Sequence, residues 1–139
     1  MTIEITSERD RVDLGRLYEW LVGSYWANER TLEEQRTAVA NSMNFSAYID
    51  GQMVGYARIV TDGCTFAWLC DVIVDPEFRG RGIGTALMDF VFSNPDVLRV
   101  RRFLLGTRDA HALYRRYDFV DTEPGRIMRR GFKNLAPKE

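Results

Sequence analysis

A glycine-rich turn is the part of the chain with the clearest chemistry. Its glycines alternate with other residues, directly after the apolar run 72–74 and directly before a helix-like apolar pattern. Such glycines let a backbone approach a ligand in dihedral angles that side chains disfavour. The first amides of the helix point outward at its positive end, where phosphate groups bind. We therefore predict a phosphate-binding loop made of Arg79, Gly80, Arg81, Gly82, Ile83, Gly84 and Thr85.

The turn lacks the residues of two common phosphate loops. A nucleotide-hydrolysing P-loop needs a lysine directly after its last glycine, whereas the residue directly after Gly84 is Thr85. A dinucleotide-binding loop needs a third glycine, but the registers that start at Gly80 and Gly82 place Thr85 and Leu87 there. What remains is either a different phosphate loop or an ordinary turn between a strand and a helix.

Two segments resemble the signatures of one family. The pattern Arg-x-x-Gly-x-Gly at 79–84 resembles the acetyl-CoA pyrophosphate loop of the GNAT superfamily of N-acyltransferases, and 110–119 resembles its second signature, Ala-x-x-Leu-Tyr-x-x-x-Gly-Phe. Asp118 stands where the family usually has glycine, and aspartate tolerates a left-handed turn. The resemblance spans about 45–132. Shorter segments at 25–27, 60–62 and 107–111 are similar to a bacterial subgroup of generic acetyltransferases, which names no substrate.

The resemblance implies roles for particular residues in acetyl transfer. Tyr114 would protonate the leaving thiolate, and simple packing of this ring is the alternative. Arg79 and Arg81 would add positive charge near the phosphates of acetyl-CoA, unless they are solvated surface charges. The strand before the loop would offer a backbone N–H from 71–74 to the oxyanion and pair with the pantetheine arm, with Val72, Ile73 and Val74 as the cofactor-binding residues.

Asp71 is a carboxylate inside the otherwise apolar run 66–74. A buried carboxylate is costly unless it is paired or used in catalysis. Asp71 is therefore a candidate general base for the amine, directly or through water, and a structural salt bridge to Arg58 or Arg108 is the alternative. His111, the one histidine of the chain, is a second candidate base, with a hydrogen bond near a helix start as its alternative.

The acceptor is expected beside the loop between the first two helices, as the resemblance implies. This loop carries Tyr25, Trp26 and Arg30. Two aromatic rings beside an arginine can hold an apolar or planar group and a carboxylate. The alternative is that these rings cap the core.

Composition limits the remaining possibilities. A chain of 139 residues with 45% apolar residues can bury one sizeable core, so we predict a single domain over 1–139. Nineteen basic and twenty acidic residues give a net charge of −1, which argues against nucleic acid or an anionic membrane as a partner. The absence of a signal-like segment predicts a cytoplasmic protein with Cys64 and Cys70 reduced. One histidine and no Cys-x-x-Cys pair predict that no metal is bound.

The apolar periodicity and turn residues predict an α/β fold. Its sheet is mixed, mostly antiparallel and twisted, with a central splayed parallel strand pair and about four flanking helices, as in the GNAT fold. The expected strands are 3–6, 45–49, 53–59, 66–74 and 103–105, with 66–74 covered on both faces, and a last hairpin near 119 and 127–130. The expected helices are 12–22, one from Thr31, one from the glycine-rich turn to about 92, and 110–117 with Asp109 as N-cap. Residues 136–139 are expected to fray.

The expected function is an acetyl-CoA-dependent N-acetyltransferase. A primary amine of a small molecule or a peptide would attack directly in a ternary complex, because neither cysteine has a neighbouring base in the sequence. The alternative is a non-catalytic CoA-binding or sensing module. Because many relatives of the resembled family dimerise, a homodimer is an expectation as well.

Overall fold

The computed structural model describes residues 2–131. The chain divides into two compact units, one that ends at Asp109 and one that starts at Ala110. The prediction of a single domain over 1–139 stays a prediction. The end of the resemblance near residue 132 and the expected fraying at 136–139 lie outside the described residues.

A five-stranded sheet forms the framework of the first unit, in the order β1-β2-β3-β4-β5. β1 to β4 pair antiparallel, and β4 pairs with β5 in parallel. The strands are β1 Glu4–Thr6, β2 Met43–Ile49, β3 Gln52–Thr61, β4 Ala67–Val74 and β5 Phe103–Leu104. The predicted mixed, mostly antiparallel sheet is therefore confirmed. The parallel pair lies at one edge of the described sheet and not in its centre as predicted.

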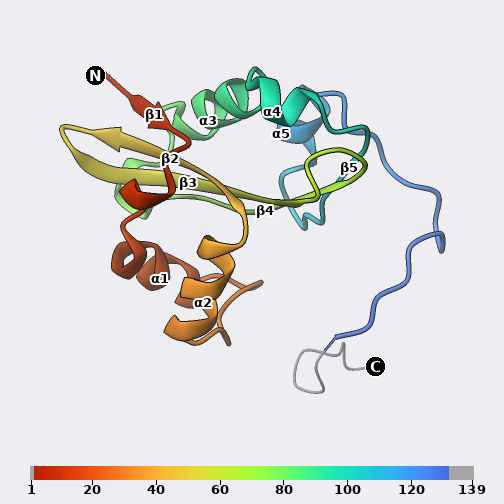
Figure 1. Cartoon of the computed structure of the whole chain (residues 1–139), viewed down its shortest axis with the longest axis horizontal. Coiled ribbons are helices and arrows are strands. Elements are labelled where there is room, and N and C mark those ends of the chain that lie inside the picture. The colour runs from red at the N-terminus through yellow and green to blue at the C-terminus, as the bar shows by residue number, and fades with distance from the viewer. Residues whose placement is uncertain (1, 132–139) are drawn as a thin grey trace. The chain divides into compact units, whose positions relative to one another are not determined.

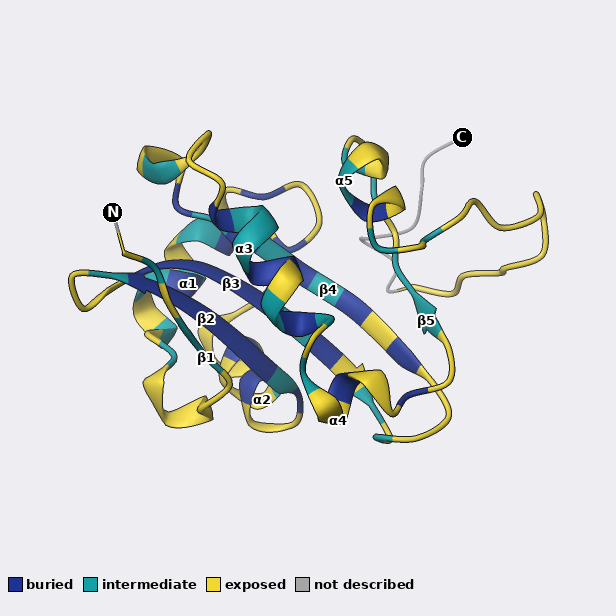
Figure 2. Ribbon diagram, turned by 90° about the horizontal axis from the view of Figure 1, so that it is seen from above, coloured by how far each residue is buried: buried dark blue, intermediate teal, exposed yellow. Residues whose placement is uncertain are grey.

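Helices cover both faces of this sheet (Figure 1). One face carries α1, Leu14–Val22, and α2, Leu32–Ala40; the other carries α3, Ile83–Val91, and the short α4, Pro95–Leu98. Two 3-10 turns, Arg9–Arg11 and Pro76–Phe78, complete the first unit, and α5, His111–Arg115, lies in the second. Figure 2 shows β2 and β3 largely buried between these layers.

Local sequence signals place several element boundaries. Asp50 and Gly51 have positive φ angles of 50° and 80°, as a tight hairpin between β2 and β3 requires. Thr31 caps α2 and forms the predicted reciprocal capping box with Glu34. α1 ends at Gly23, also as predicted.

Three expectations about the elements are wrong. Burial alternates along β4: Trp68 is 37% exposed and residues 70, 72 and 74 are only partly buried, so the strand is not fully covered on both faces as predicted. The expected hairpin near 119 and 127–130 is absent from the described residues, where 120–131 are exposed and contain no strand. Asp109 does not cap α5, because its N-cap is Ala110, without a side-chain cap.

α3 packs very closely on the sheet at Gly55 of β3. A Cβ atom there would lie 3.0 Å from Ile83 Cγ2 and 3.0 Å from Leu87 Cδ1. A side chain at this position would require both α3 side chains to move by a few tenths of an ångström, so glycine allows the close approach. The contact fixes the first turn of α3, and therefore the glycine-rich turn before it, against the carboxyl-terminal half of β4.

Candidate functional site

The glycine-rich turn forms an open backbone loop at the start of α3. Gly80 and Gly82 both have φ angles of 79°, and Gly82 is the left-handed N-cap of the helix. The first amide bonded back into the helix is that of Ala86, which donates to the carbonyl of Gly82 at 3.0 Å. The amides of Ile83 and Gly84 precede it and have no acceptor within the helix. We call residues 79–85 the phosphate loop.

The space around the phosphate loop fits a bound phosphate group. A Cβ atom built at Gly80 or Gly82 would meet nothing within 4 Å, and one at Gly84 would meet only Val74 at 3.9 Å. The glycines therefore do not serve internal packing. Their bare backbone leaves room for a ligand at the positive end of α3, which suits the pyrophosphate of acetyl-CoA.

The two arginines of the phosphate loop are exposed, and each contacts a residue just before the loop. Arg79 Nε donates to the carbonyl of Val74 at 3.2 Å, and the Arg81 guanidinium lies 4.9 Å from the Phe78 ring centroid. Both guanidinium groups therefore lie on the surface beside the loop.

A bulge interrupts the pairing of β4 with β3 at Asp71. Tyr56 pairs with Ile73 and Arg58 with Cys70, so Asp71 and Val72 stand opposite a single residue. Asp71 has a φ of 52°, in the left-handed region. A bulge leaves one residue outside the ladder, so its backbone groups are available to a ligand. The backbone predicted to meet the oxyanion therefore lies at or next to this bulge, where a backbone amide is not used by β3.

The Asp71 carboxylate accepts hydrogen bonds from three side chains, two in the loop between α1 and α2 and one in β3. Oδ2 accepts from Arg30 Nη1 at 2.6 Å and from Arg58 Nε at 2.9 Å, and Oδ1 accepts from Trp26 Nε1 at 3.0 Å. The carboxylate is 0% exposed. We call Asp71, Arg30, Arg58 and Trp26 the Asp71 cluster. The predicted alternative of an ion pair with Arg58 is present, whereas Arg108 is not a partner of Asp71.

The electrostatics of this cluster disfavour proton uptake by Asp71. Burial alone would raise the pKa of Asp71, but the hydrogen bond from Arg30 and the charges of Arg58 and Arg30 hold it below its usual value. A general base for an amine needs the opposite shift. Next to it, burial raises the pKa of the Cys70 thiol to about 11, so this cysteine stays protonated and is a poor nucleophile.

The predicted acceptor residues separate into two sets. Arg30 is used by Asp71 and by Gln35, whose Oε1 accepts from Arg30 Nη1 at 3.0 Å. Tyr25 and Trp26 remain 46% and 40% exposed and meet edge to face, with ring centroids 5.1 Å apart. The two rings are therefore partly exposed, and the Trp26 ring also covers the buried Asp71 carboxylate to which it donates.

The arginine that lies over the aromatic pair is Arg108. Its guanidinium lies 3.9 Å from the centroid of the Tyr25 ring, and its backbone amide donates to Tyr25 Oη at 3.2 Å. The sequence did not predict this contact, because 83 residues separate the partners. A solitary aromatic-arginine pair at such a distance leaves no periodic signal.

Two further polar pairs position the site and were missed by the sequence reasoning. Arg16 of α1 forms a salt bridge with Asp75, directly after β4, and its Nε donates to the carbonyl of Met53 in β3 at 2.7 Å. The two contacts connect α1 to both strands. Buried Tyr56 donates to Asn44, whose amide in turn donates to Val39 at 2.9 Å.

The second unit carries the other predicted catalytic residue. Tyr114 is buried in α5, and its ring meets that of Phe119 edge to face with centroids 6.0 Å apart. Asp118 has a φ of 69°, which confirms that it takes the left-handed conformation of the usual glycine. His111 is the exposed first residue of α5. The predicted proton-transfer roles of Tyr114 and His111 stay predictions.

Other kinds of site receive no support from residues 2–131. This part of the chain contains no group of three or more His, Cys, Asp or Glu side chains placed to hold a metal ion. None of its helices has both the length and the apolar composition needed to cross a membrane.

The fold and the site together define a class of protein: a mixed α/β sheet in which a bulged strand leads into a backbone phosphate loop. A sequence profile of the acetyltransferase (GNAT) domain matches residues 40–121, which is more than half of the chain. The chain belongs to the GNAT acetyltransferase family.

Solved structures agree with this assignment. A GNAT-family protein from Xanthomonas campestris pv. campestris is 38% identical, with a TM-score of 0.91, and the match covers 97% of this chain and 96% of that one. An acetyltransferase structure from Deinococcus radiodurans shares the fold at 21% identity and a TM-score of 0.71, covering 92% and 88%. The glucosamine-6-phosphate N-acetyltransferase of Arabidopsis thaliana does so at 16% identity and a TM-score of 0.67, covering 96% and 99%.

Proposed function

We propose that the protein is an acetyl-CoA-dependent N-acetyltransferase whose acceptor is a primary amine. Acetyl-CoA supplies an acetyl group activated as a thioester. The amine nitrogen bonds to the acetyl carbon, the carbon–sulfur bond breaks, and the proton lost by the amine balances the one gained by the thiolate. Direct attack in a ternary complex fits the raised pKa of Cys70, which disfavours a covalent enzyme intermediate.

The observation that carries this proposal is the open phosphate loop of a GNAT-family chain directly beyond the bulged strand. Backbone amides of Arg79, Gly80, Arg81, Gly82, Ile83, Gly84 and Thr85 would hold the phosphates. The backbone of Val72, Ile73 and Val74 would hold the pantetheine arm, and an amide at the bulge would stabilise negative charge on the thioester oxygen.

For Asp71 we favour positioning over general-base catalysis. Its carboxylate accepts three side-chain hydrogen bonds, and its pKa is lowered. It ties the loop between α1 and α2 to the bulge of β4, so it orders the acceptor side of the site. The amine would then lose its proton to water or to another group.

For Tyr114 we keep the proposal that its phenol protonates the leaving thiolate. Tyr114→Phe is expected to lower kcat by about 100-fold or more, in the range of a lost acid catalyst, without changing acetyl-CoA affinity. Tyr117→Phe removes the same hydroxyl three positions further along and is the matched control. An unchanged kcat in Tyr114→Phe would remove this residue from the mechanism.

The first experiment is a calorimetric titration with acetyl-CoA, followed in the same preparation by thiol release with a panel of amines. Binding with turnover supports the transferase. Binding without turnover on any amine supports the alternative, a CoA-binding or sensing module. Absence of binding contradicts the assignment of the phosphate loop, on which both depend.

A further inference from the structure

The Asp71 cluster contains more positive than negative charge. Two guanidinium groups, those of Arg30 and Arg58, form salt bridges with the single carboxylate of Asp71. Their side chains are only 26% and 11% exposed. Excess charge in such a partly buried place is unfavourable until an opposite charge approaches it. The acceptor side of the site therefore favours an anion.

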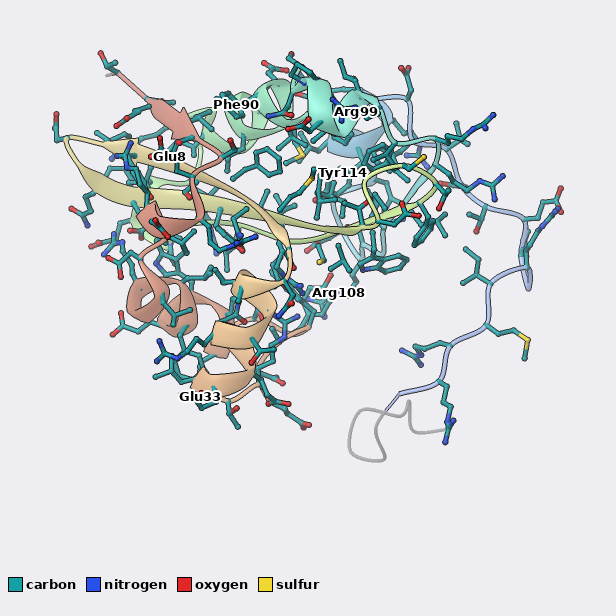
Figure 3. The ribbon with its side chains drawn as sticks, in the orientation of Figure 1. Glu8, Glu33, Phe90, Arg99, Arg108 and Tyr114 are labelled. Atoms are coloured by element: carbon teal, nitrogen blue, oxygen red, sulfur yellow. The ribbon has the colours of Figure 1, made fainter. Side chains whose placement is uncertain are left out.

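Arg108 adds a third positive charge to the same side. The ring and the hydroxyl of Tyr25 hold it in place, and the residue is exposed. The salt bridges formed within the described part of the chain do not include it. Figure 3 shows Arg108 on the side of the sheet where α1 and α2 lie. Its planar guanidinium is thus positioned and has donors left for a ligand.

A continuous set of contacts joins Arg108 to the bulge of β4. The Arg108 guanidinium lies on Tyr25, Tyr25 meets Trp26, and Trp26 donates to Asp71 at the bulge. A ligand that spans the two exposed rings therefore reaches from Arg108 toward the strand where acetyl transfer is proposed. The apolar rings suit the carbon skeleton of such a ligand.

We propose that the acceptor is an amine that also carries a carboxylate, and that Arg108 is the residue that binds this carboxylate. The inference rests on the proposed N-acetyltransferase function and names its substrate class. It also reassigns the anion-binding role predicted for Arg30, because Arg30 is used by Asp71 and Gln35.

The excess positive charge has a chemical consequence for the amine. A cationic surrounding lowers the pKa of a bound ammonium group, so a larger fraction is neutral and able to attack. The same charge repels an ammonium ion that has no carboxylate to anchor it. The site therefore selects amino acids over simple amines and eases deprotonation without a carboxylate base.

The test compares matched pairs of acceptors that differ in the carboxylate. Thiol release is measured with L-phenylalanine against phenethylamine and with 4-aminobutyrate against butylamine. In one pair or both, we expect kcat/KM to be at least about 10-fold higher for the carboxylate-bearing member, as for one charge-assisted hydrogen-bonded contact.

Variants of Arg108 assign the effect to this residue. Arg108→Gln is expected to raise KM for the carboxylate-bearing amine about 10-fold, with kcat within about twofold. KM for its plain partner should not rise, because the variant removes one charge that repels the ammonium group. Arg108→Lys keeps the charge and should recover part of the loss. Arg101→Gln removes another exposed arginine and is the matched control. A calorimetric titration with N-acetyl-L-phenylalanine gives a readout independent of turnover, in which Arg108→Gln should weaken binding.

The outcomes separate the two proposals. Equal rates on both members of each pair, or a preference that survives in Arg108→Gln, would overturn the inference and leave the N-acetyltransferase intact. A clear preference for O-phosphoethanolamine over all four of these acceptors would mean that the site binds a phosphate and not a carboxylate. This result would also overturn the inference. If no amine of any kind is acetylated, the proposed function fails, and the inference fails with it.

Discussion

The phosphate loop and the Asp71 cluster are built differently. The cluster surrounds the bulge in the middle of β4, and the loop follows the carboxyl-terminal end of this strand. The loop uses the backbone of consecutive residues, with two left-handed glycines and a helix start. The cluster uses side chains from positions 26, 30, 58 and 71, which only the folded chain brings together. A ligand shared by a whole family suits the first construction, and a variable acceptor suits the second.

The largest effect on stability is expected when the Asp71 cluster loses its carboxylate. Asp71→Asn keeps the shape and tolerates the left-handed φ, but it leaves two partly buried guanidinium groups uncompensated. We expect the free energy of unfolding to fall by about 3 kcal/mol, at the low end for a broken buried pair because Arg30 keeps some exposure. Urea unfolding measures this loss.

An exposed ion pair provides the control for this variant. Asp96 pairs with Arg99 at 3.1 Å, with both side chains more than half exposed. Asp96→Asn should change the free energy of unfolding by less than about 0.5 kcal/mol. A similar small change in Asp71→Asn would mean that the cluster does not hold the acceptor side together.

The next effect concerns the backbone of the phosphate loop. Gly82→Val places a β-branched side chain at a φ of 79° and fills the open space in front of α3. We expect acetyl-CoA affinity to fall by about 10- to 100-fold, together with a loss of about 1–2 kcal/mol in stability. Calorimetry and urea unfolding measure the two effects separately.

A second left-handed glycine separates strain from ligand binding. Gly63 has a φ of 81° and equally open surroundings, but it lies in the turn between β3 and β4. Gly63→Val should cost similar stability and leave acetyl-CoA affinity unchanged. If both variants weakened binding alike, the loop would owe its effect to general strain and the contrast with the cluster would disappear.

The smallest expected effect is the pH dependence of stability, and it tests directly whether Asp71 could act as a base. Because its folded pKa lies below its unfolded value, the carboxylate stabilises the fold at all pH values above about 4, and this stabilisation is lost as the pH falls through the folded pKa. The stability gap between the natural protein and Asp71→Asn should therefore stay constant from pH 7 to pH 5 and narrow only in stronger acid. A gap that changes between pH 7 and pH 5 would indicate a raised pKa and would restore Asp71 as a candidate base.

Much of the framework follows from local chemistry that a sequence displays directly. The hairpin at Asp50 and Gly51 and the capping box at Thr31 formed as predicted, because each depends on neighbours within four residues. The hairpin expected near 119 and 127–130 failed because its apolar residues have no pairing partner among the described strands. Strand pairing is a property of two segments, and a pattern in one of them does not guarantee it.

The sequence by itself indicated the family and the geometry of the loop at 79–85, because that geometry needs only consecutive residues: glycines that adopt positive φ angles and a helix that starts directly after them. The tertiary structure decided the charges of the acceptor side. Arg30, Arg58 and Arg108 look alike in the sequence, and only the fold shows that the first two compensate Asp71 while the third rests on Tyr25. Salt bridges act over a few ångströms in space, so separation along the chain gives no indication of which arginine is left for a ligand.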